Sequence, residues 1–520
     1  MLRKYLIYFG SKAIEEIEAN PYILIDITRG VDFKQIDKMA LDLGINYNNQ
    51  KRVTSGIKYG LIRSTYNGNT CVLKDNLMEF VITLLEVSIE NIEDALIDLK
   101  VKNEIVLEKR EDGEYIYLYA FYNAEQEIAL RLNTLQKAKN VKKTPHIENE
   151  LKRLEQSSSI ILSDRQKEAI KLVNENNVTI ITGGPGTGKT TIIKSIIDIY
   201  EGKGKKVVLC APTGRAAKRM TETTQKEAST LHRLLEIGKI NEDSLYKNTS
   251  DYEGTPIDGD IIIVDEMSMV DMFLMNYLLK CIYQGTKLIL VGDEDQLASV
   301  GPGSVLKDLI HSEQIATIHL DKIFRQAAKS KIVLNAHRVN QGEYFLKKEE
   351  NEDLEEMKED FFFIKEGYQE KMLKEVISLC TGRLQRYGNY DFFQSIQVLS
   401  PTKKGILGTK ELNKALQEKL NPNNYNLPEK ATMGTIYRIG DRVMQIKNNY
   451  DIDWEKNISG KKEMGTGVFN GEIGTITEIR EREKQLEIKF DDEKIAWYEF
   501  SNLDQIEHSY AITIHKSQRK

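Results

Sequence analysis

The chain has 520 residues, of which 40% are hydrophobic and 29% are charged, and its formal net charge is -6. This apolar content can fill several cores, while the mild acidity excludes a histone-like polycation, so any nucleic-acid contact must come from local basic stretches. The sequence shows neither a secretory signal nor an apolar run near the ~18 residues that span a bilayer, so we expect a cytoplasmic protein without membrane contact. The four cysteines are widely separated and show no paired spacing, which indicates reduced thiols and excludes a zinc site or a disulfide framework. They are Cys71, Cys210, Cys281 and Cys380.

The N-terminal region predicts helices and one hairpin. Residues 1–70 contain "NPYILIDITRGVDFKQIDKMALDLGI", with two helical stretches around a turn at Gly30. Residues 71–140 predict two helices and a hairpin that turns at Asp112-Gly113, which is a winged-helix-like order. The second of these helices is acidic, so a scaffold role is favoured there over a grip on DNA.

The stretch "VTIITGGPGTGKTTIIKSIIDIY" predicts a strand, a glycine-rich turn and an amphipathic helix. Its residues have the G-x-x-x-x-G-K-[ST] spacing of a phosphate-binding loop, in which backbone N–H groups and a helix N-terminus surround phosphate oxygens. Lys189 can reach the β- and γ-phosphates, and the Thr190 hydroxyl can hold Mg²⁺. We expect a nucleoside triphosphate to be bound by Gly183, Gly184, Pro185, Gly186, Thr187, Gly188, Lys189, Thr190 and Thr191.

A helix start rich in basic side chains follows the next strand, in "VVLCAPTGRAAKRM". The helix opens with Thr213 and Gly214, and Arg215 comes directly after them. Such a helix start can grip a nucleic-acid phosphate backbone. Composition alone favours a solvated basic face, whereas the neighbouring motifs favour the nucleic-acid contact.

Two further strands end in polar side chains. "DGDIIIVDEMSMVD" predicts a buried strand at 261–264, followed by Asp265, which would hold Mg²⁺, and Glu266, which would orient or deprotonate the attacking water. After "TKLILVGDED", the neutral amide of Gln296 can sense a γ-phosphate. The alternation of strands and helices predicts a parallel, doubly wound sheet with its ligand at the carboxyl edge of the strands.

These motifs occur in order with "LSDRQKEAI", "STLHRLLEIG", "LDKIFRQA", "NAHRVNQG", "VLSPTKKGILGTKELN", "GDRVMQIKNNYD" and "AITIHKSQ". From about residue 10 to its end, the chain resembles the RecD/TraA branch of superfamily 1 DNA helicases. The resemblance implies an ATP-dependent translocase that moves 5′ to 3′ on single-stranded DNA and acts at junctions between single- and double-stranded DNA in repair or recombination. It also implies ATP and Mg²⁺ as cofactors, and we expect a monomer.

The resemblance assigns roles to individual residues. Gln166 would read the adenine edge, and Arg325 would be an arginine finger at the border of a second motor domain. The implied catalytic set is Lys189, Asp265, Glu266, Gln296 and Arg325. The implied DNA track is Thr213, Gly214, Arg215, Thr230, His232, Thr402, His515 and Lys516. For each of the two histidines, the alternative is a buried core side chain.

The fold that follows is α/β, with two RecA-like P-loop motor domains. We expect motor domain 1 at 145–330, interrupted by a β-hairpin pin at about 237–260. Motor domain 2 would occupy 331–520. Short strands with glycine turns predict a small β-barrel at about 431–506, and the resemblance implies that it is an SH3-like insertion in motor domain 2.

The chain departs from the family pattern at both ends. In the helix-hairpin-helix element expected within residues 1–70, Asp32 replaces a glycine that normally faces a phosphate, which favours a scaffold role. In "HKSQRK", Arg519 stands at a glycine position and the final helicase motif is missing. We therefore expect a truncated helicase, and the alternative function is an ATP- and single-stranded-DNA-binding protein without productive unwinding.

Overall fold

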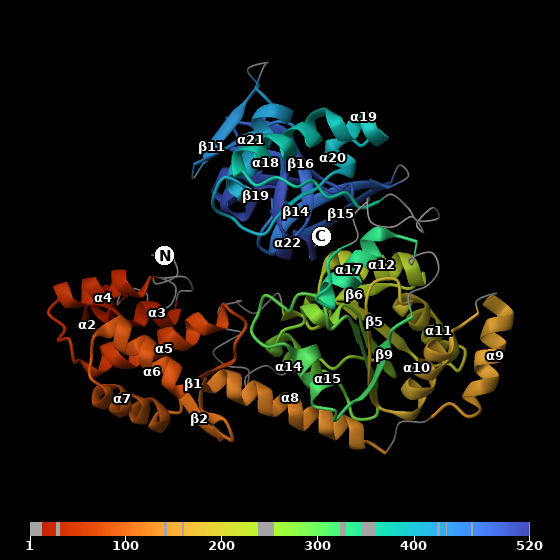
Figure 1. Cartoon of the computed structure of the whole chain (residues 1–520), viewed down its shortest axis with the longest axis horizontal. Helices are drawn as coiled ribbons and strands as arrows, with labels where there is room; N and C mark the ends of the chain where they lie inside the picture. Colours follow the sequence, from red (N-terminus) through yellow and green to blue (C-terminus); the bar gives the residue numbers. More distant parts are fainter. Residues whose placement is uncertain are drawn as a thin grey trace. The chain divides into compact units, whose positions relative to one another are not determined.

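The structure is a computed structural model in which two compact units are distinguished (Figure 1). Unit 1 is drawn from Met1–Phe345 and unit 2 from Glu359–Lys520. None of the helices in the described ranges is long and apolar enough to cross a membrane. The structure describes residues 13–27, 32–139, 143–158, 161–237, 254–322, 329–345, 360–423, 427–432, 434–458 and 461–518.

The N-terminal part of unit 1 is built around one apolar core that extends from Tyr22 to Ile116. The segments 1–70 and 71–140, expected as two domains, share this core. Asp32 caps helix α4 by accepting a hydrogen bond from the Lys34 backbone N–H at 3.2 Å, which is a structural role. The predicted turn at Gly30 lies outside the described residues. The elements are α2 (Ala13–Ala19), α3 (Ile23–Ile27), α4 (Phe33–Asp42), α5 (Gln50–Thr65), β1 (Cys71–Leu73), α6 (Lys74–Leu85), α7 (Ile89–Val101), β2 (Ile105–Arg110) and β3 (Gly113–Leu118).

The rest of unit 1 is a parallel sheet of six strands in the order β6-β5-β7-β8-β4-β9. The strands are rich in β-branched residues, and four of them are almost wholly buried, as expected for a parallel sheet covered on both faces. The strand predicted at 261–264 is β7, with the same bounds. The strands are β4 (Val178–Gly183), β5 (Val207–Ala211), β6 (Ala228–Thr230), β7 (Ile261–Val264), β8 (Lys287–Gly292) and β9 (Ala316–Leu320).

Helices cover both faces of this sheet (Figure 1). Successive residues of a strand point to opposite faces, so Ile262 packs with α8, α14 and α15, whereas Ile263 packs with α9, α10 and α11. Two apolar layers therefore enclose the sheet and hold the carboxyl ends of the strands at one edge. The helices are α8 (Tyr119–Lys137), α9 (Ile147–Ser158), α10 (Asp164–Glu175), α11 (Lys189–Glu201), α12 (Gly214–Thr224), α13 (Leu231–Leu234), α14 (Met272–Lys280), α15 (Val305–His311) and α17 (Lys331–Asn340).

Unit 2 combines a small α/β part with an antiparallel sheet. Parallel strands β10 and β20 pair with each other, and seven strands form a sheet in the order β15-β14-β18-β17-β16-β13-β19. The boundary predicted at Lys331 is not the boundary between the units, because α17 belongs to unit 1. The elements are α18 (Gln369–Ser378), α19 (Leu384–Gly388), α20 (Phe392–Ser395), β10 (Val398–Ser400), α21 (Thr409–Leu420), β11 (Glu429–Thr432), β12 (Thr435–Arg438), β13 (Arg442–Gln445), β14 (Asn449–Ile458), β15 (Lys461–Val468), β16 (Ile473–Arg480), β17 (Gln485–Phe490), β18 (Ile495–Glu499), β19 (Ile506–His508), β20 (Ala511–Thr513) and α22 (Ile514–Gln518).

Candidate nucleotide site and DNA-facing residues

The glycine-rich loop of unit 1 joins the end of β4 to the start of α11. Gly186 and Gly188 have positive φ angles of 78° and 85°, which glycine adopts without strain. The Lys189 ammonium donates hydrogen bonds to the carbonyl oxygens of Gly183 and, at 3.1 Å, of Gly184. The loop therefore places a lysine at the N-terminus of a thirteen-residue helix, which is the arrangement that binds phosphate.

Two acidic residues follow β7, close to the glycine-rich loop. Asp265 accepts a hydrogen bond from the Glu266 backbone N–H at 2.9 Å. Glu266 has a positive φ of 55°, an uncommon conformation for a residue with a side chain and one that is often found at functional sites. Parallel pairing of β7 with β8, and of β8 with β4, brings these carboxylates to the same edge as the loop.

Burial raises the pKa of the Asp265 carboxyl, while the charges of Lys189 and Arg219 act against this rise. Burial also raises the pKa of Glu266, and the neighbouring carboxylate of Asp265 adds to the effect. A glutamate whose pKa is raised in this way is a better acceptor for a water proton than an exposed glutamate. Because burial raises the pKa of both carboxyls, these shifts do not distinguish the two roles, and the division of roles stays a prediction.

The oxygen donors at this edge fit Mg²⁺. Thr190 offers a hydroxyl and Asp265 a buried carboxylate, and Mg²⁺ bound with a nucleotide uses one or two carboxylates and keeps several waters. In the described ranges, no group of three or more His, Cys, Asp or Glu side chains could hold a metal ion by itself. The donor set therefore suits an ion that arrives with phosphates, and does not suit a cage made only of protein ligands.

Two predicted glutamines have partners within the protein. Gln296 follows β8 and donates its amide N–H to Asp293 at 3.2 Å, which fixes the side chain at the carboxyl edge. Gln166 is buried in a capping box at the start of α10, where its amide oxygen accepts from the Ser163 backbone N–H at 2.9 Å. Its amide nitrogen lies 3.5 Å from the Gly188 carbonyl oxygen. The structure thus places Gln166 beside the glycine-rich loop and gives it a helix-capping role that sequence reasoning missed.

Two side chains reach the site although no nucleotide role was predicted for them. Arg219 was expected on the basic face of the helix that contacts DNA, yet its charge acts on both Asp265 and Glu266. His337, on α17, packs against Gly184: a Cβ built on that glycine would lie 2.5 Å from the His337 Cε1 atom. The motif "NAHRVNQG" contained the histidine, but nothing in its local pattern indicated contact with the glycine-rich loop.

The DNA-facing candidates of unit 1 lie after two paired strands. β5 and β6 are parallel, with Ala211 opposite Thr230, so Thr230, the last residue of β6, and Thr213, just after β5, lie at the same edge of the sheet. Each threonine caps a helix: Thr213 accepts from the Ala216 N–H and Thr230 from the Arg233 N–H, both at 3.2 Å. The start of the second helix also contains His232. At the first helix, a Cβ on Gly214 would meet no atom within 4 Å, and the exposed Arg215 follows it.

The candidates of unit 2 follow a second pair of parallel strands. Ser400 of β10 lies opposite Thr513 of β20, so Thr402 and the start of α22, with His515 and Lys516, come after the same edge. The Lys516 ammonium forms an ion pair with Glu507 at 2.6 Å. The structure therefore brings the three predicted residues to one end of the strand pair, with part of the lysine charge neutralised.

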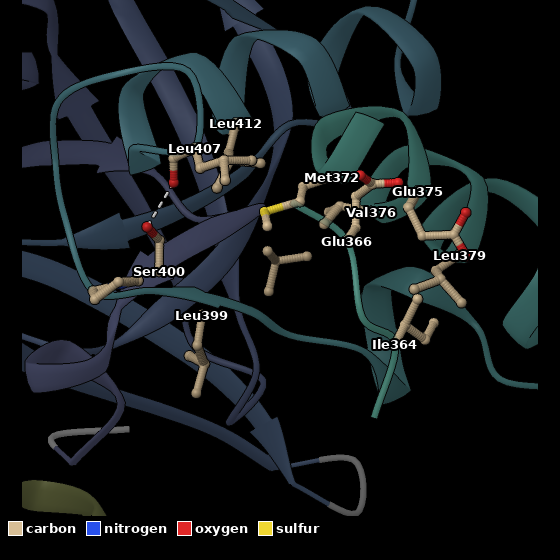
Figure 2. A pocket seen from close by; sticks show the side chains of 12 residues that line it. Ile364, Glu366, Met372, Glu375, Val376, Leu379, Leu399, Ser400, Leu407 and Leu412 are labelled. Atoms are coloured by element: carbon tan, nitrogen blue, oxygen red, sulfur yellow. Dashed lines mark hydrogen bonds between the residues drawn. The ribbon is translucent and has the colours of Figure 1, made fainter. Parts of the chain in front are cut away.

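An apolar cavity of about 300 Å³ lies beside β10 (Figure 2). The Ser400 hydroxyl donates to the Leu407 carbonyl oxygen at 2.6 Å and shapes the loop that carries Thr402. Met372 and Val376 of α18 line the cavity together with Leu412 of α21. None of the predicted site residues lines it. Arg325 and most of the predicted pin at 237–260 lie outside the described residues.

Comparison with known proteins places three family models on the chain. Among curated relatives, the ATP-dependent RecD2 DNA helicase of Deinococcus radiodurans is 29% identical over 98% of this chain and 66% of that protein. The RecBCD enzyme subunit RecD of Buchnera aphidicola subsp. Acyrthosiphon pisum is 29% identical over 80% of this chain and 74% of that protein. The chain thus spans just under two thirds of the first of these relatives. The models are "ATP-dependent RecD2 DNA helicase HHH domain" (2–71), "AAA domain" (161–358) and "ATP-dependent RecD-like DNA helicase SH3 domain" (412–490).

Among solved structures, a Pif1 helicase from Bacteroides in complex with ADP-AlF3 and ssDNA shows 17% identity and a TM-score of 0.37, with 69% of this chain and 84% of that chain covered. A similarity at this level supports no argument about mechanism. The family models and the curated relatives confirm the resemblance that the motifs indicated.

Proposed function

Because two RecD-like family models and a RecD2 helicase relative match the chain, we propose that it is a RecD-like ATP-dependent DNA helicase of superfamily 1 whose nucleotide site is the glycine-rich loop of unit 1. One observation carries the assignment of the site: Lys189 and the carboxylates of Asp265 and Glu266 lie close enough for their charges to interact at the carboxyl edge of a parallel sheet. This edge is where open α/β sheets bind nucleotides.

Each side chain has a role that its environment supports. Lys189 supplies positive charge to the β- and γ-phosphates, and Thr190 with Asp265 would hold Mg²⁺, which neutralises phosphate charge when it is bound. Glu266 orients the attacking water and accepts its proton. Gln296, fixed by Asp293, senses the γ-phosphate.

Arg325 would be the arginine finger in this scheme. The segment that contains it follows β9 and precedes α17, and both of these elements contact the glycine-rich loop. Leu320 at the end of β9 lies so close to Gly183 that a Cβ there would be 2.7 Å from the Leu320 carbonyl oxygen. His337 of α17 is in similar contact with Gly184. Arg325 itself lies outside the described residues, and the contacts of the elements on either side of it with the loop support this role.

Single-stranded DNA would be held by two similar pairs of strand ends. In unit 1, Thr213 follows β5 and Thr230 ends its partner β6, and in unit 2, Thr402 and His515 follow the paired strands β10 and β20. This correspondence supports unit 2 as a second RecA-like motor domain that carries the SH3 domain. Binding through helix starts and backbone phosphates would be largely independent of base sequence.

The test combines ATP hydrolysis with strand displacement. The 520-residue chain should hydrolyse ATP faster with single-stranded DNA and displace a strand from a fork with a 5′ tail. Lys189→Ala and Glu266→Gln should each lower hydrolysis by about 100-fold or more, since each removes a group that acts on the transition state. The matched control is Lys206→Ala, which removes an exposed lysine at the amino end of β5, paired with Asp258, and should leave hydrolysis unchanged.

Three results would contradict the proposal in different ways. Hydrolysis that survives Lys189→Ala would show that the site is elsewhere. DNA-stimulated hydrolysis without displacement of any strand would identify an ATP-dependent DNA-binding protein. Displacement only from a 3′ tail would refute the expected polarity.

A further inference from the structure

The ring of His337 is packed against the glycine-rich loop, as the contact with Gly184 shows. A Cβ built on Gly184 would lie 2.5 Å from Cε1, 3.2 Å from Nε2 and 3.4 Å from Nδ1 of the imidazole. The nearest ring atoms are therefore the carbon between the two nitrogens and the nitrogens themselves, so the polar edge of the ring faces the loop. Only a residue without a side chain at 184 permits this approach.

The Nε2 atom of His337 is buried and has no hydrogen-bond partner among the described residues. A neutral imidazole nitrogen donates a hydrogen bond in one tautomer and accepts one in the other, and native structures rarely leave such a buried atom unpaired. Simple packing does not account for this choice, because an apolar side chain of similar size would fill the same space without an unpaired polar atom. A ligand group bound at the loop would supply such a partner.

The position of Lys189 indicates which ligand group this partner is. The lysine ammonium donates to the Gly184 carbonyl oxygen at 3.1 Å, so the ammonium and the His337 ring both contact the same residue of the loop. A lysine in this motif reaches the β- and γ-phosphates. The polar edge of His337 therefore lies near the end of the site that receives the terminal phosphates.

We propose that Nε2 of His337 donates a hydrogen bond to the terminal phosphate of a bound nucleoside triphosphate and thereby makes the site distinguish triphosphate from diphosphate. This inference rests on the proposed function of the loop and adds a positioning residue to it. His337 does not take part in proton transfer in this scheme. Its contribution is to affinity for the triphosphate and to the alignment of the γ-phosphate for attack.

Equilibrium binding of two nucleotides tests the proposal. The probes are ADP and a non-hydrolysable ATP analogue, each with Mg²⁺, titrated calorimetrically into the full chain. His337→Leu should weaken binding of the analogue by about 10-fold or more, the range for one hydrogen bond to a charged group, and leave ADP affinity within about two-fold. A purely structural role of His337 would weaken both nucleotides alike.

A matched pair of polar variants separates hydrogen bonding from packing. The amide nitrogen of glutamine can reach the position of Nε2, whereas the shorter asparagine reaches only as far as Nδ1. His337→Gln should therefore keep the preference for the triphosphate analogue, and His337→Asn should lose it although the two side chains are similar in polarity. If His337→Gln and His337→Asn both keep the wild-type ratio of affinities, the proposal is wrong.

The outcome for Lys189→Ala distinguishes this proposal from the function on which it rests. If the wild-type chain binds neither nucleotide, or if Lys189→Ala binds as well as wild type, the nucleotide site itself is wrongly placed. If wild type binds, Lys189→Ala does not, and His337→Leu keeps the wild-type preference, only the role of His337 is refuted. Thermal unfolding of each variant verifies that the fold is retained.

Discussion

Asp441 of unit 2 is fully buried, and its carboxylate accepts five hydrogen bonds that join three parts of that unit. The donors come from α21 and its C-cap, from the last residue of β12, and from β19 and the residues before β20. Because a carboxylate can only accept, and does so through two oxygens, it satisfies all five at once. The donors are Asn421 (2.7 Å) and Tyr510 (2.8 Å) to Oδ1, and Gln417 (2.6 Å), the Arg438 backbone N–H (2.7 Å) and His508 (3.0 Å) to Oδ2.

Asp441→Asn keeps the shape of the side chain but turns one acceptor oxygen into a donor. The new NH₂ group is least unfavourable at the position of Oδ1, where it would face two donors, whereas at the position of Oδ2 it would face three. The Tyr510 hydroxyl can rotate to accept, but the Asn421 amide also donates to the Ile439 carbonyl oxygen at 3.0 Å and would lose that bond if it flipped. With one donor left facing another and a charge removed, we expect a loss of about 3 kcal/mol in the free energy of unfolding. Asp441→Ala removes the acceptor of all five hydrogen bonds and should cost about 5 kcal/mol or more, a large part of a domain's stability.

The two tryptophans of the chain make the measurement specific to this unit. Trp454 lies in β14 and Trp497 in β18, both in the seven-stranded sheet. Urea unfolding followed by tryptophan fluorescence therefore reports on unit 2 alone. With a slope of about 2 kcal/mol per molar urea, the midpoint for Asp441→Asn should fall by about 1.5 M.

The control is an acidic residue in a good ion pair at the surface. Asp491 forms a bidentate pair with Arg442 at 2.6 and 2.7 Å, and its side chain is 52% exposed. Since exposed pairs contribute ~0–1 kcal/mol, Asp491→Asn should shift the midpoint little. The reasoning is refuted if Asp441→Asn lowers the midpoint no more than Asp491→Asn does.

Three further outcomes follow from the structure. Burial raises the pKa of Glu266. The acid limb of the kcat profile for ATP hydrolysis should therefore lie at a higher pH than the pKa of an exposed glutamate. An acid limb at or below that pKa would contradict this. Burial lowers the pKa of Lys287 to about 8; between that pH and the ordinary lysine pKa of ~10.4 the folded state binds fewer protons than the unfolded state. Stability should thus rise with pH in this window in wild type but not in Lys287→Met, as denaturation at several pH values would show. Arg215→Ala should reduce by about one unit the slope of log affinity for single-stranded DNA against log salt; the control Arg153→Ala, on α9, should leave it unchanged.

The sequence determined the features whose geometry is local. A glycine-rich turn between a strand and a helix fixes its own backbone, so the sequence predicted the strand, turn and helix that the structure shows from β4 to α11. The buried strand that precedes Asp265 was predicted with the bounds of β7, because continuous β-branched runs are typical of a parallel sheet covered on both faces. The motifs, taken in order, also indicated the family before any fold was known.

Only the tertiary structure decided which of these segments meet. Gly184 and His337 are far apart in the chain, and no local pattern predicts that the ring packs against the loop. Arg219 has the spacing of a basic helix face, yet packing brings its charge near the carboxylates that follow β7. Asp441 occurs in a turn, where an acidic residue is ordinarily exposed, and becomes a buried acceptor because three distant segments converge on it. Spacing along a chain specifies a turn or a strand, whereas contacts between segments depend on the order in which strands pair and on which helix covers which face.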